Sequence, residues 1–82
     1  MRVTINQLQE MKNRGEKISM ITAYDYTSSL ICNDLGFPLI LVGDSASMVM
    51  FGYENTTPVT MKEMLLILKA VVRGNDTALV VA

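Results

Sequence analysis

The chain has 82 residues, half of them hydrophobic, and its seven basic and eight acidic residues give a net charge of −1. That length fits one small domain or a piece of a larger one. A chain this short buries only about 60% of the surface that its unfolded form exposes, so we expect a thin margin of stability. The charges are spread singly along the chain, so the sequence does not predict a nucleic-acid-binding surface.

Cys32 is the single cysteine, so the chain cannot form an internal disulfide and is not a disulfide-stabilised secreted scaffold. The chain contains no histidine that would activate this thiol, and Cys32 is therefore expected to be a small buried hydrophobe. The polar N-terminal segment is no signal peptide, and the longest apolar run, residues 64–68, is too short to span a membrane. We expect a soluble, cytoplasmic protein.

The first predicted element is a short amphipathic helix over residues 5–14. Thr4 and Gln7 have the spacing of a capping box, which satisfies the free amides at a helix start. Gly15 supplies a left-handed stop at the other end. The expected apolar face of this helix consists of Ile5, Leu8 and Met11.

A strand, a helix and a second strand are predicted next. Residues 18–22 are rich in β-branched side chains, and residues 39–42 form the continuous apolar run typical of a buried parallel strand. Between them, Asp25 is placed to cap a helix over residues 26–35 that ends at Gly36. The side chains expected to point inward from this helix are Leu30, Ile31 and Leu35.

A longer helix and a third strand are predicted in the second half. Thr60 and Glu63 form another capping box, and Gly74 is expected to end the helix that follows. Its predicted apolar stripe consists of Met64, Leu65, Leu68, Val71 and Val72. The other expected segments are an apolar stretch of ambiguous structure over residues 46–51, a loop over residues 52–58 and a strand over residues 78–82.

The order of elements is therefore a helix followed by βαβαβ, which indicates an α/β fold with parallel strands joined by right-handed crossovers. The third strand is as apolar as a central one, and a sheet of three such strands would expose hydrophobic surface and unpaired backbone groups. We therefore expect this chain to be part of a larger α/β domain.

Polar residues follow the first two predicted strands, where ligands collect in parallel α/β folds. The stronger candidate is Asp44, which follows four aliphatic residues and Gly43. A carboxylate in this position is expected to lie in a partly dry pocket, where it needs a partner or a cation. With Ser45 it could hold Mg²⁺ and the oxygens of a small acid. The alternative, in which Asp44 caps the next turn, is equally open from spacing alone.

Four neighbouring residues have structural interpretations. Asp25 is well placed as a helix cap, and Tyr24 is expected to pack its ring while its hydroxyl finds a partner. Met48 and Met50 are expected to fill gaps in the core.

Four short segments follow one another at a specific spacing. They are Ile21-Thr22-Ala23-Tyr24-Asp25-Tyr26, Leu41-Val42-Gly43-Asp44-Ser45, Gly52-Tyr53 and Thr57-Pro58-Val59-Thr60. Each segment alone is a weak signal, but their succession resembles the start of the ketopantoate hydroxymethyltransferase family. The similarity extends from about Lys17 to the end of the chain.

The resemblance implies that residues 1–82 are the N-terminal part of a single (βα)8 TIM-type barrel of the phosphoenolpyruvate/pyruvate-like kind. Members transfer a hydroxymethyl group from 5,10-methylenetetrahydrofolate to 3-methyl-2-oxobutanoate, giving 2-dehydropantoate in pantothenate biosynthesis. They use Mg²⁺ and are cytoplasmic homo-oligomers, often decamers. By the family motif, Asp44 ligates the metal and contacts the oxo-acid, and Ser45 contacts the same substrate.

The sequence also departs from the family pattern. Ala46 and Ser47 stand where the family usually has Leu and Gly. The resemblance places the general base and a second metal-binding Asp beyond Ala82, so the 82-residue chain alone is expected to be inactive. Two alternatives are a related Mg²⁺-dependent oxo-acid lyase or mutase barrel, and a non-catalytic remnant with a role in assembly.

Overall fold

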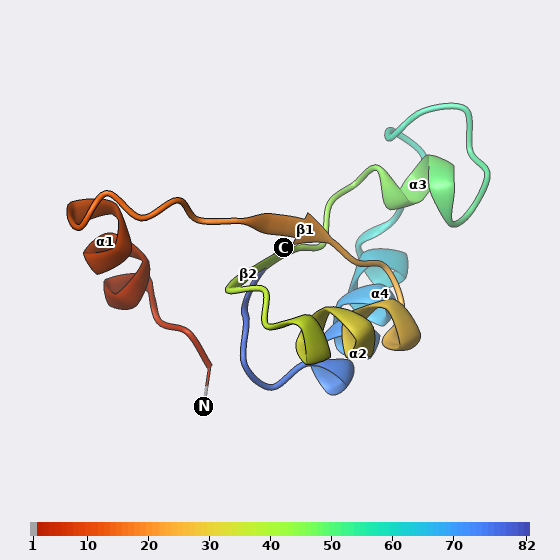
Figure 1. Cartoon of the computed structure of the whole chain (residues 1–82). Coiled ribbons are helices and arrows are strands. Elements are labelled where there is room, and N and C mark those ends of the chain that lie inside the picture. The colour runs from red at the N-terminus through yellow and green to blue at the C-terminus, as the bar shows by residue number, and fades with distance from the viewer. Residues whose placement is uncertain (1) are drawn as a thin grey trace.

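The computed structural model of the chain describes residues 2–82 and shows an α/β fold built on a three-stranded parallel sheet (Figure 1). The helices are α1 (Ile5–Asn13), α2 (Tyr26–Leu35), α3 (Ala46–Val49) and α4 (Met61–Gly74). The strands are β1 (Met20–Thr22), β2 (Leu39–Leu41) and β3 (Leu79–Val81), in the spatial order β1-β2-β3. The predicted α/β order is confirmed, and the ambiguous apolar stretch contains the short helix α3.

The predicted helix boundaries depend on local hydrogen bonds that the structure confirms. Both capping boxes are present, Thr4 with Gln7 before α1 and Thr60 with Glu63 before α4. In each, the threonine hydroxyl accepts from a backbone amide while the longer side chain accepts from the threonine amide. Gly36 ends α2 with a φ of 76°, a left-handed conformation that favours glycine.

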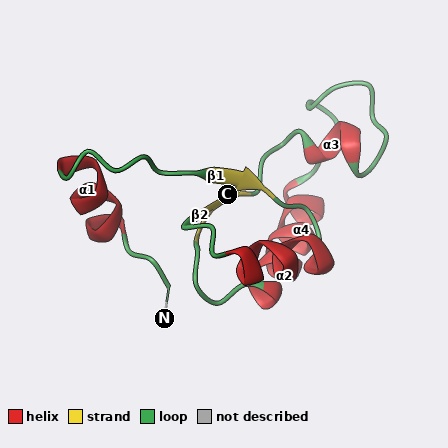
Figure 2. Cartoon of the chain, viewed as in Figure 1, coloured by secondary structure: helices red, strands yellow, loops and turns green. Residues whose placement is uncertain are grey.

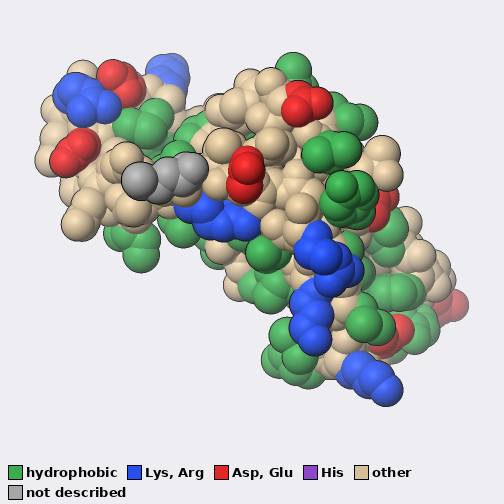
Figure 3. Space-filling view, turned by 90° about the horizontal axis from the view of Figure 1, so that it is seen from below, with side chains coloured by type: hydrophobic (Ala, Val, Ile, Leu, Met, Phe, Trp, Pro, Cys, Tyr) green, Lys and Arg blue, Asp and Glu red, His purple; other side chains and the backbone are tan. Residues whose placement is uncertain are grey.

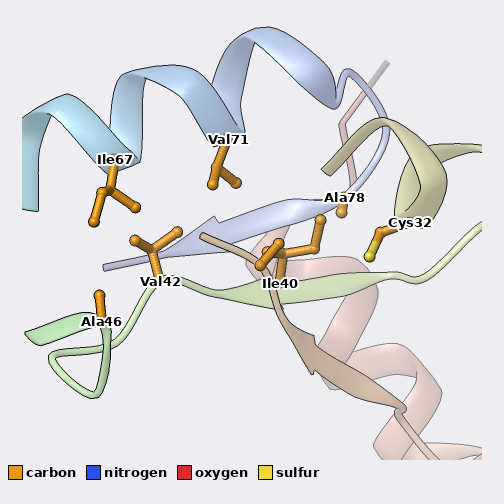
Figure 4. Close-up of a cluster of buried hydrophobic side chains, with 8 residues drawn as sticks. Cys32, Ile40, Val42, Ala46, Ile67, Val71 and Ala78 are labelled. Carbon is orange, nitrogen blue, oxygen red and sulfur yellow. The ribbon is translucent and has the colours of Figure 1, made fainter. Parts of the chain in front are cut away.

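One face of the sheet carries the hydrophobic core. The register aligns Ile21, Ile40 and Val80 across the three strands, so their side chains share a face. Ile67 and Val71 of α4 approach this face from above in Figure 4. Because α2 and α4 lie side by side on the same face, β2 is covered by both helices and Ile40 is fully buried (Figure 1).

The opposite face of the sheet is less covered. Met20 and Val81, which point away from α2 and α4, are 53% and 40% exposed. The β2 residues on that face, Leu39 and Leu41, are only half-buried. The described residues therefore cover one face of an apolar sheet and leave the second face largely open.

The predicted inward face of α2 is wrong. Leu30, Ile31 and Leu35 are 41%, 56% and 69% exposed, whereas Ser29 and Cys32 are the buried residues of this helix. The prediction for Cys32 is thus confirmed. Ser29 lies against α4, and its small side chain lets the two helices pack closely, whereas a large one would hold them apart.

The predicted stripe of α4 is correct only in part. Val71 is buried and Met64 and Leu68 pack against the core, but Leu65 and Val72 are 44% and 41% exposed. Ile67, which the prediction omitted, is in the core. Leu65 and Val72 therefore add to the exposed hydrophobic side chains of the molecule. Figure 3 shows several hydrophobic groups on the surface that it draws.

Gly74 is the last residue of α4, which confirms the predicted end of this helix. The capping residue is Asn75, in an extended conformation. A Cβ atom at Gly74 would lie 2.6 Å from the backbone oxygen of Tyr26 and 3.0 Å from the Cβ of Ser29. The glycine therefore permits the close approach of α2 and α4.

The helix α1 lies apart from the sheet (Figure 2). It has no buried residue, and Ile5 on its predicted apolar face is 74% exposed. The segment before it is attached to the end of α4 and to the residue before β3, because the guanidinium of Arg2 donates to the carbonyls of Val72 and Ala78 at 3.1 and 2.9 Å. None of the helices in the described residues is long and apolar enough to cross a membrane.

Candidate functional site

The two predicted polar segments lie at one edge of the sheet. β1 and β2 are parallel, with Thr22 paired to Leu41, so the residues after both strands emerge at the same carboxyl edge. The amide of Ala23 still donates to the carbonyl of Leu41, at 3.3 Å. The loops after β1 and β2 therefore lie next to each other at this edge of the sheet.

Asp44 lies in the turn between β2 and α3. Its neighbours Val42 and Ala46 are buried, but Asp44 itself is exposed. The expectation of a partly dry pocket is wrong for residues 2–82, which enclose no pocket around it.

The alternative role of Asp44 as a helix cap does not match the geometry. The N-cap residue of α3 is Ser45, and no side chain caps this helix. Asp44 contributes only its backbone carbonyl, which accepts from the amide of Ser47 at 2.9 Å. The carboxylate is thus not used to begin the helix.

Ser45 is hydrogen-bonded to Tyr24, across the two loops. Tyr24 is half-buried, its ring packs against the core, and its hydroxyl bonds with the hydroxyl of Ser45. The expectation that the Tyr24 hydroxyl finds a partner is confirmed. The identity of that partner was not predictable from local sequence, because the two residues are 21 positions apart.

Asp25 has the structural role predicted for it. Its carboxylate accepts from the backbone amide of Ser28 at 2.7 Å and caps α2. This hydrogen bond, with a further one from the Ser28 side chain, holds the pKa of Asp25 below its ordinary value. Asp25 is therefore committed to the helix start and is a poor candidate for proton transfer.

The segment between α3 and α4 is attached to the first turn of α4 through Tyr53. The hydroxyl of Tyr53 donates to the carboxylate of Glu63 at 3.1 Å. The pKa of Glu63 is lowered mainly by the hydrogen bond from the Thr60 amide, and the bond to Glu63 raises the pKa of Tyr53. These contacts fix the exposed loop to the start of α4.

Ser47 of α3 holds the middle of the same segment. Its side chain is fully buried, and its hydroxyl donates to the carbonyl of Asn55 at 2.6 Å. Met48 and Met50 do not fill the core as predicted, because they are 42% and 44% exposed on the outer side of the same segment. The small polar residue is inside and the methionines are outside.

Replacing Ser47 by Gly is expected to destabilise the chain by about 1–2 kcal/mol, because the Asn55 carbonyl loses its donor and the backbone gains freedom. Thermal unfolding measures this loss, and limited proteolysis should cut the loop between Gly52 and Pro58 faster. Ser47→Ala is the matched control, since it removes the hydroxyl without adding a glycine. Melting curves and cleavage rates equal to wild type in both variants would contradict this role for Ser47.

The oxygen donors at this edge are of the kind that bind hard cations. Asp44 offers a carboxylate and Ser45 a hydroxyl, and Mg²⁺ is commonly bound through one or two carboxylates with waters and substrate oxygens in the other positions. No three His, Cys, Asp or Glu side chains come together anywhere in residues 2–82. The donors therefore fit one side of a Mg²⁺ shell, without forming a complete protein cage.

The family described as ketopantoate hydroxymethyltransferase has a model that matches residues 2–82. The chain is also similar to curated proteins named 3-methyl-2-oxobutanoate hydroxymethyltransferase. It is 62% identical over 81 residues to the one from Moorella thermoacetica, covering 99% of this chain and 30% of the relative. It is 56% identical to those from Chloroflexus aurantiacus and Dehalococcoides mccartyi, covering 29% of each. The chain thus spans about 30% of the length of these relatives.

Proposed function

Because the chain belongs to the ketopantoate hydroxymethyltransferase family, we propose that it forms part of the active site of a 3-methyl-2-oxobutanoate hydroxymethyltransferase. The reaction joins the one-carbon unit of 5,10-methylenetetrahydrofolate to the oxo-acid, takes the hydroxyl from water and releases tetrahydrofolate, which gives 2-dehydropantoate. The observation that carries the proposal is the position of Asp44 and Ser45, side by side at the carboxyl edge of a parallel sheet. The loop after β1 contributes Tyr24 to the same place.

The chemistry of the oxo-acid explains why such residues are needed. Removing a proton from the carbon beside the ketone places negative charge on the carbonyl oxygen, and the carbon then attacks the one-carbon unit. Asp44 would hold Mg²⁺, and the bound cation supplies Lewis-acid stabilisation of that charge. Ser45 would donate a hydrogen bond to the acid and fix its orientation. The base that removes the proton is proposed to lie outside residues 2–82.

The open face of the sheet supports a larger enclosing fold. Alternate residues of the strands point away from α2 and α4 and remain exposed or half-buried, although they are apolar. In a (βα)8 barrel such residues fill the interior, while the helices cover the outside. We therefore propose that residues 1–82 are the first part of a single barrel domain, with Asp44 and Ser45 at its catalytic end.

The proposed partners follow from the same family membership. The small-molecule partners are the oxo-acid and the folate. The protein partner is the same polypeptide, in a cytoplasmic homo-oligomer such as a decamer. Nucleic acid and membranes are not among the proposed partners. The even mixture of single charges agrees with small-molecule chemistry rather than with binding to a polyanion.

A chimera tests the proposed function. Residues 2–82 replace the matching segment of the Moorella thermoacetica relative, to which they are 62% identical over 81 residues. The purified chimera is expected to form 2-dehydropantoate from 3-methyl-2-oxobutanoate and 5,10-methylenetetrahydrofolate, within about tenfold of the parent rate. Activity should vanish with a chelator and return with Mg²⁺. A folded chimera without activity, beside an active parent, would refute the proposal.

The 82-residue chain by itself serves as the control. It is expected to form no product, because the described residues supply a single carboxylate at the site and no group of metal-binding side chains. Mg²⁺-dependent turnover by this chain would show that the remaining parts of the relative are not needed.

A further inference from the structure

The loop after β1 holds a tyrosine whose hydroxyl reaches the candidate substrate-binding serine. Tyr24 follows Ala23, which is 1% exposed and whose amide donates to Leu41, so its backbone is fixed against β2. The Tyr24 ring packs against the hydrophobic core. Because the ring and the backbone of Tyr24 are both held in place, the Tyr24 hydroxyl is fixed beside the Ser45 hydroxyl.

The hydroxyl of Ser45 makes no capping hydrogen bond at the start of α3. A serine at the N-cap commonly accepts a hydrogen bond from an amide in the first turn. Here Ser45 is at the N-cap of α3, its φ and ψ are −58° and −16°, and it makes no such bond. The hydroxyl is oriented by Tyr24 instead.

The two hydroxyls differ as donors. A phenol is a stronger hydrogen-bond donor than an aliphatic hydroxyl, and either atom of this pair can donate by geometry. When the phenol donates to the serine oxygen, the serine O–H is free to donate to a third group. Linked donors polarise one another, so the serine then becomes the better donor to an anion.

We propose that Tyr24 is a positioning residue, which donates to Ser45 and directs the Ser45 hydroxyl toward the carboxylate of the bound oxo-acid. The inference rests on the proposed function and adds a residue to it. Tyr24 acts through Ser45 and makes no contact of its own with the reacting atoms. Asp44 remains the group that holds the cation.

The test is a double-mutant cycle in the chimera with the Moorella thermoacetica relative. Tyr24→Phe keeps the ring and removes the hydroxyl, and it is expected to raise KM for 3-methyl-2-oxobutanoate about tenfold with a smaller change in kcat. Ser45→Ala is expected to raise KM by at least as much. The double variant should resemble Ser45→Ala, because Tyr24 has nothing to orient once the serine hydroxyl is gone.

A matched control and a second measurement separate this role from general stability. Tyr26→Phe removes the hydroxyl of a tyrosine that is 50% exposed and is expected to leave KM unchanged. Binding of 3-methyl-2-oxobutanoate by calorimetry, in the presence of Mg²⁺, should weaken by the same factor as KM in Tyr24→Phe.

The proposed positioning is overturned if Tyr24→Phe binds the oxo-acid as tightly as wild type while Ser45→Ala binds it weakly. It is also overturned if the two effects multiply in the double variant, since Tyr24 would then act independently of Ser45. Failure of the proposed function gives a different result, because the unsubstituted chimera itself would form no product.

Discussion

Asp44→Asn is expected to lower kcat/KM for the oxo-acid by on the order of 10³-fold in the chimera, because it removes the charge that holds the cation where negative charge develops. The Mg²⁺ concentration for half-maximal activity should rise as well. Asp44 is exposed and its side chain caps no helix, so the fold does not depend on its carboxylate. The melting temperature should therefore stay close to that of the unsubstituted chimera.

Asp34→Asn provides the matched control. Asp34 is an exposed carboxylate near the end of α2, and its replacement is expected to change neither turnover nor the Mg²⁺ requirement. Equal kinetics in Asp44→Asn and the parent chimera would remove Asp44 from the metal site. A large fall in melting temperature would instead assign it a structural role that its exposure does not suggest.

The ends of the helices could be predicted because they depend on neighbouring residues. A capping box joins side chains and amides three positions apart, and a left-handed glycine acts on the turn just before it. Thr4, Asp25 and Thr60 all cap the helices that were expected, and Gly36 ends α2. The parallel order of the strands followed from the helices between them.

The faces of the helices were harder to predict because burial depends on how closely two helices approach. Large apolar residues are usually inside, which favoured Leu30 and Ile31 of α2. The structure buries Ser29 instead, and the hydroxyl of Ser29 donates to the carbonyl of Val71 at 2.5 Å. No local pattern in α2 reveals that α4 packs against it through small residues.

In the candidate site too, local features could be predicted from the sequence and contacts between distant residues could not. The position of Asp44 and Ser45 after a buried strand was predictable, because the strand pattern is local. The exposure of Asp44 and the bond between Ser45 and Tyr24 were not, since both depend on how separate loops meet. Ser47 was identified as a departure from the family pattern, but its hydrogen bond to Asn55 could not be predicted because it depends on the folded loop.

Gly74→Ala is expected to destabilise the chain by about 1–3 kcal/mol, although alanine is normally the better helix former by about 1 kcal/mol. The added Cβ would lie 2.6 Å from the backbone oxygen of Tyr26 and 3.2 Å from the backbone nitrogen of Leu30. These atoms belong to α2 and cannot rotate away as a flexible side chain would. The helices must therefore separate, which loosens the contact around buried Val71.

Thermal unfolding followed by circular dichroism measures this effect, and a loss of about 1 kcal/mol corresponds to a melting temperature about 4–8 °C lower for a chain of this length that unfolds cooperatively. Lys69→Ala is the control, because Lys69 is an exposed position of the same helix where alanine meets no neighbour across the interface. Its melting temperature should stay near that of wild type. A rise in melting temperature for Gly74→Ala would mean that helix propensity outweighs packing, and that α2 and α4 are not held at the close distance that Gly74 permits.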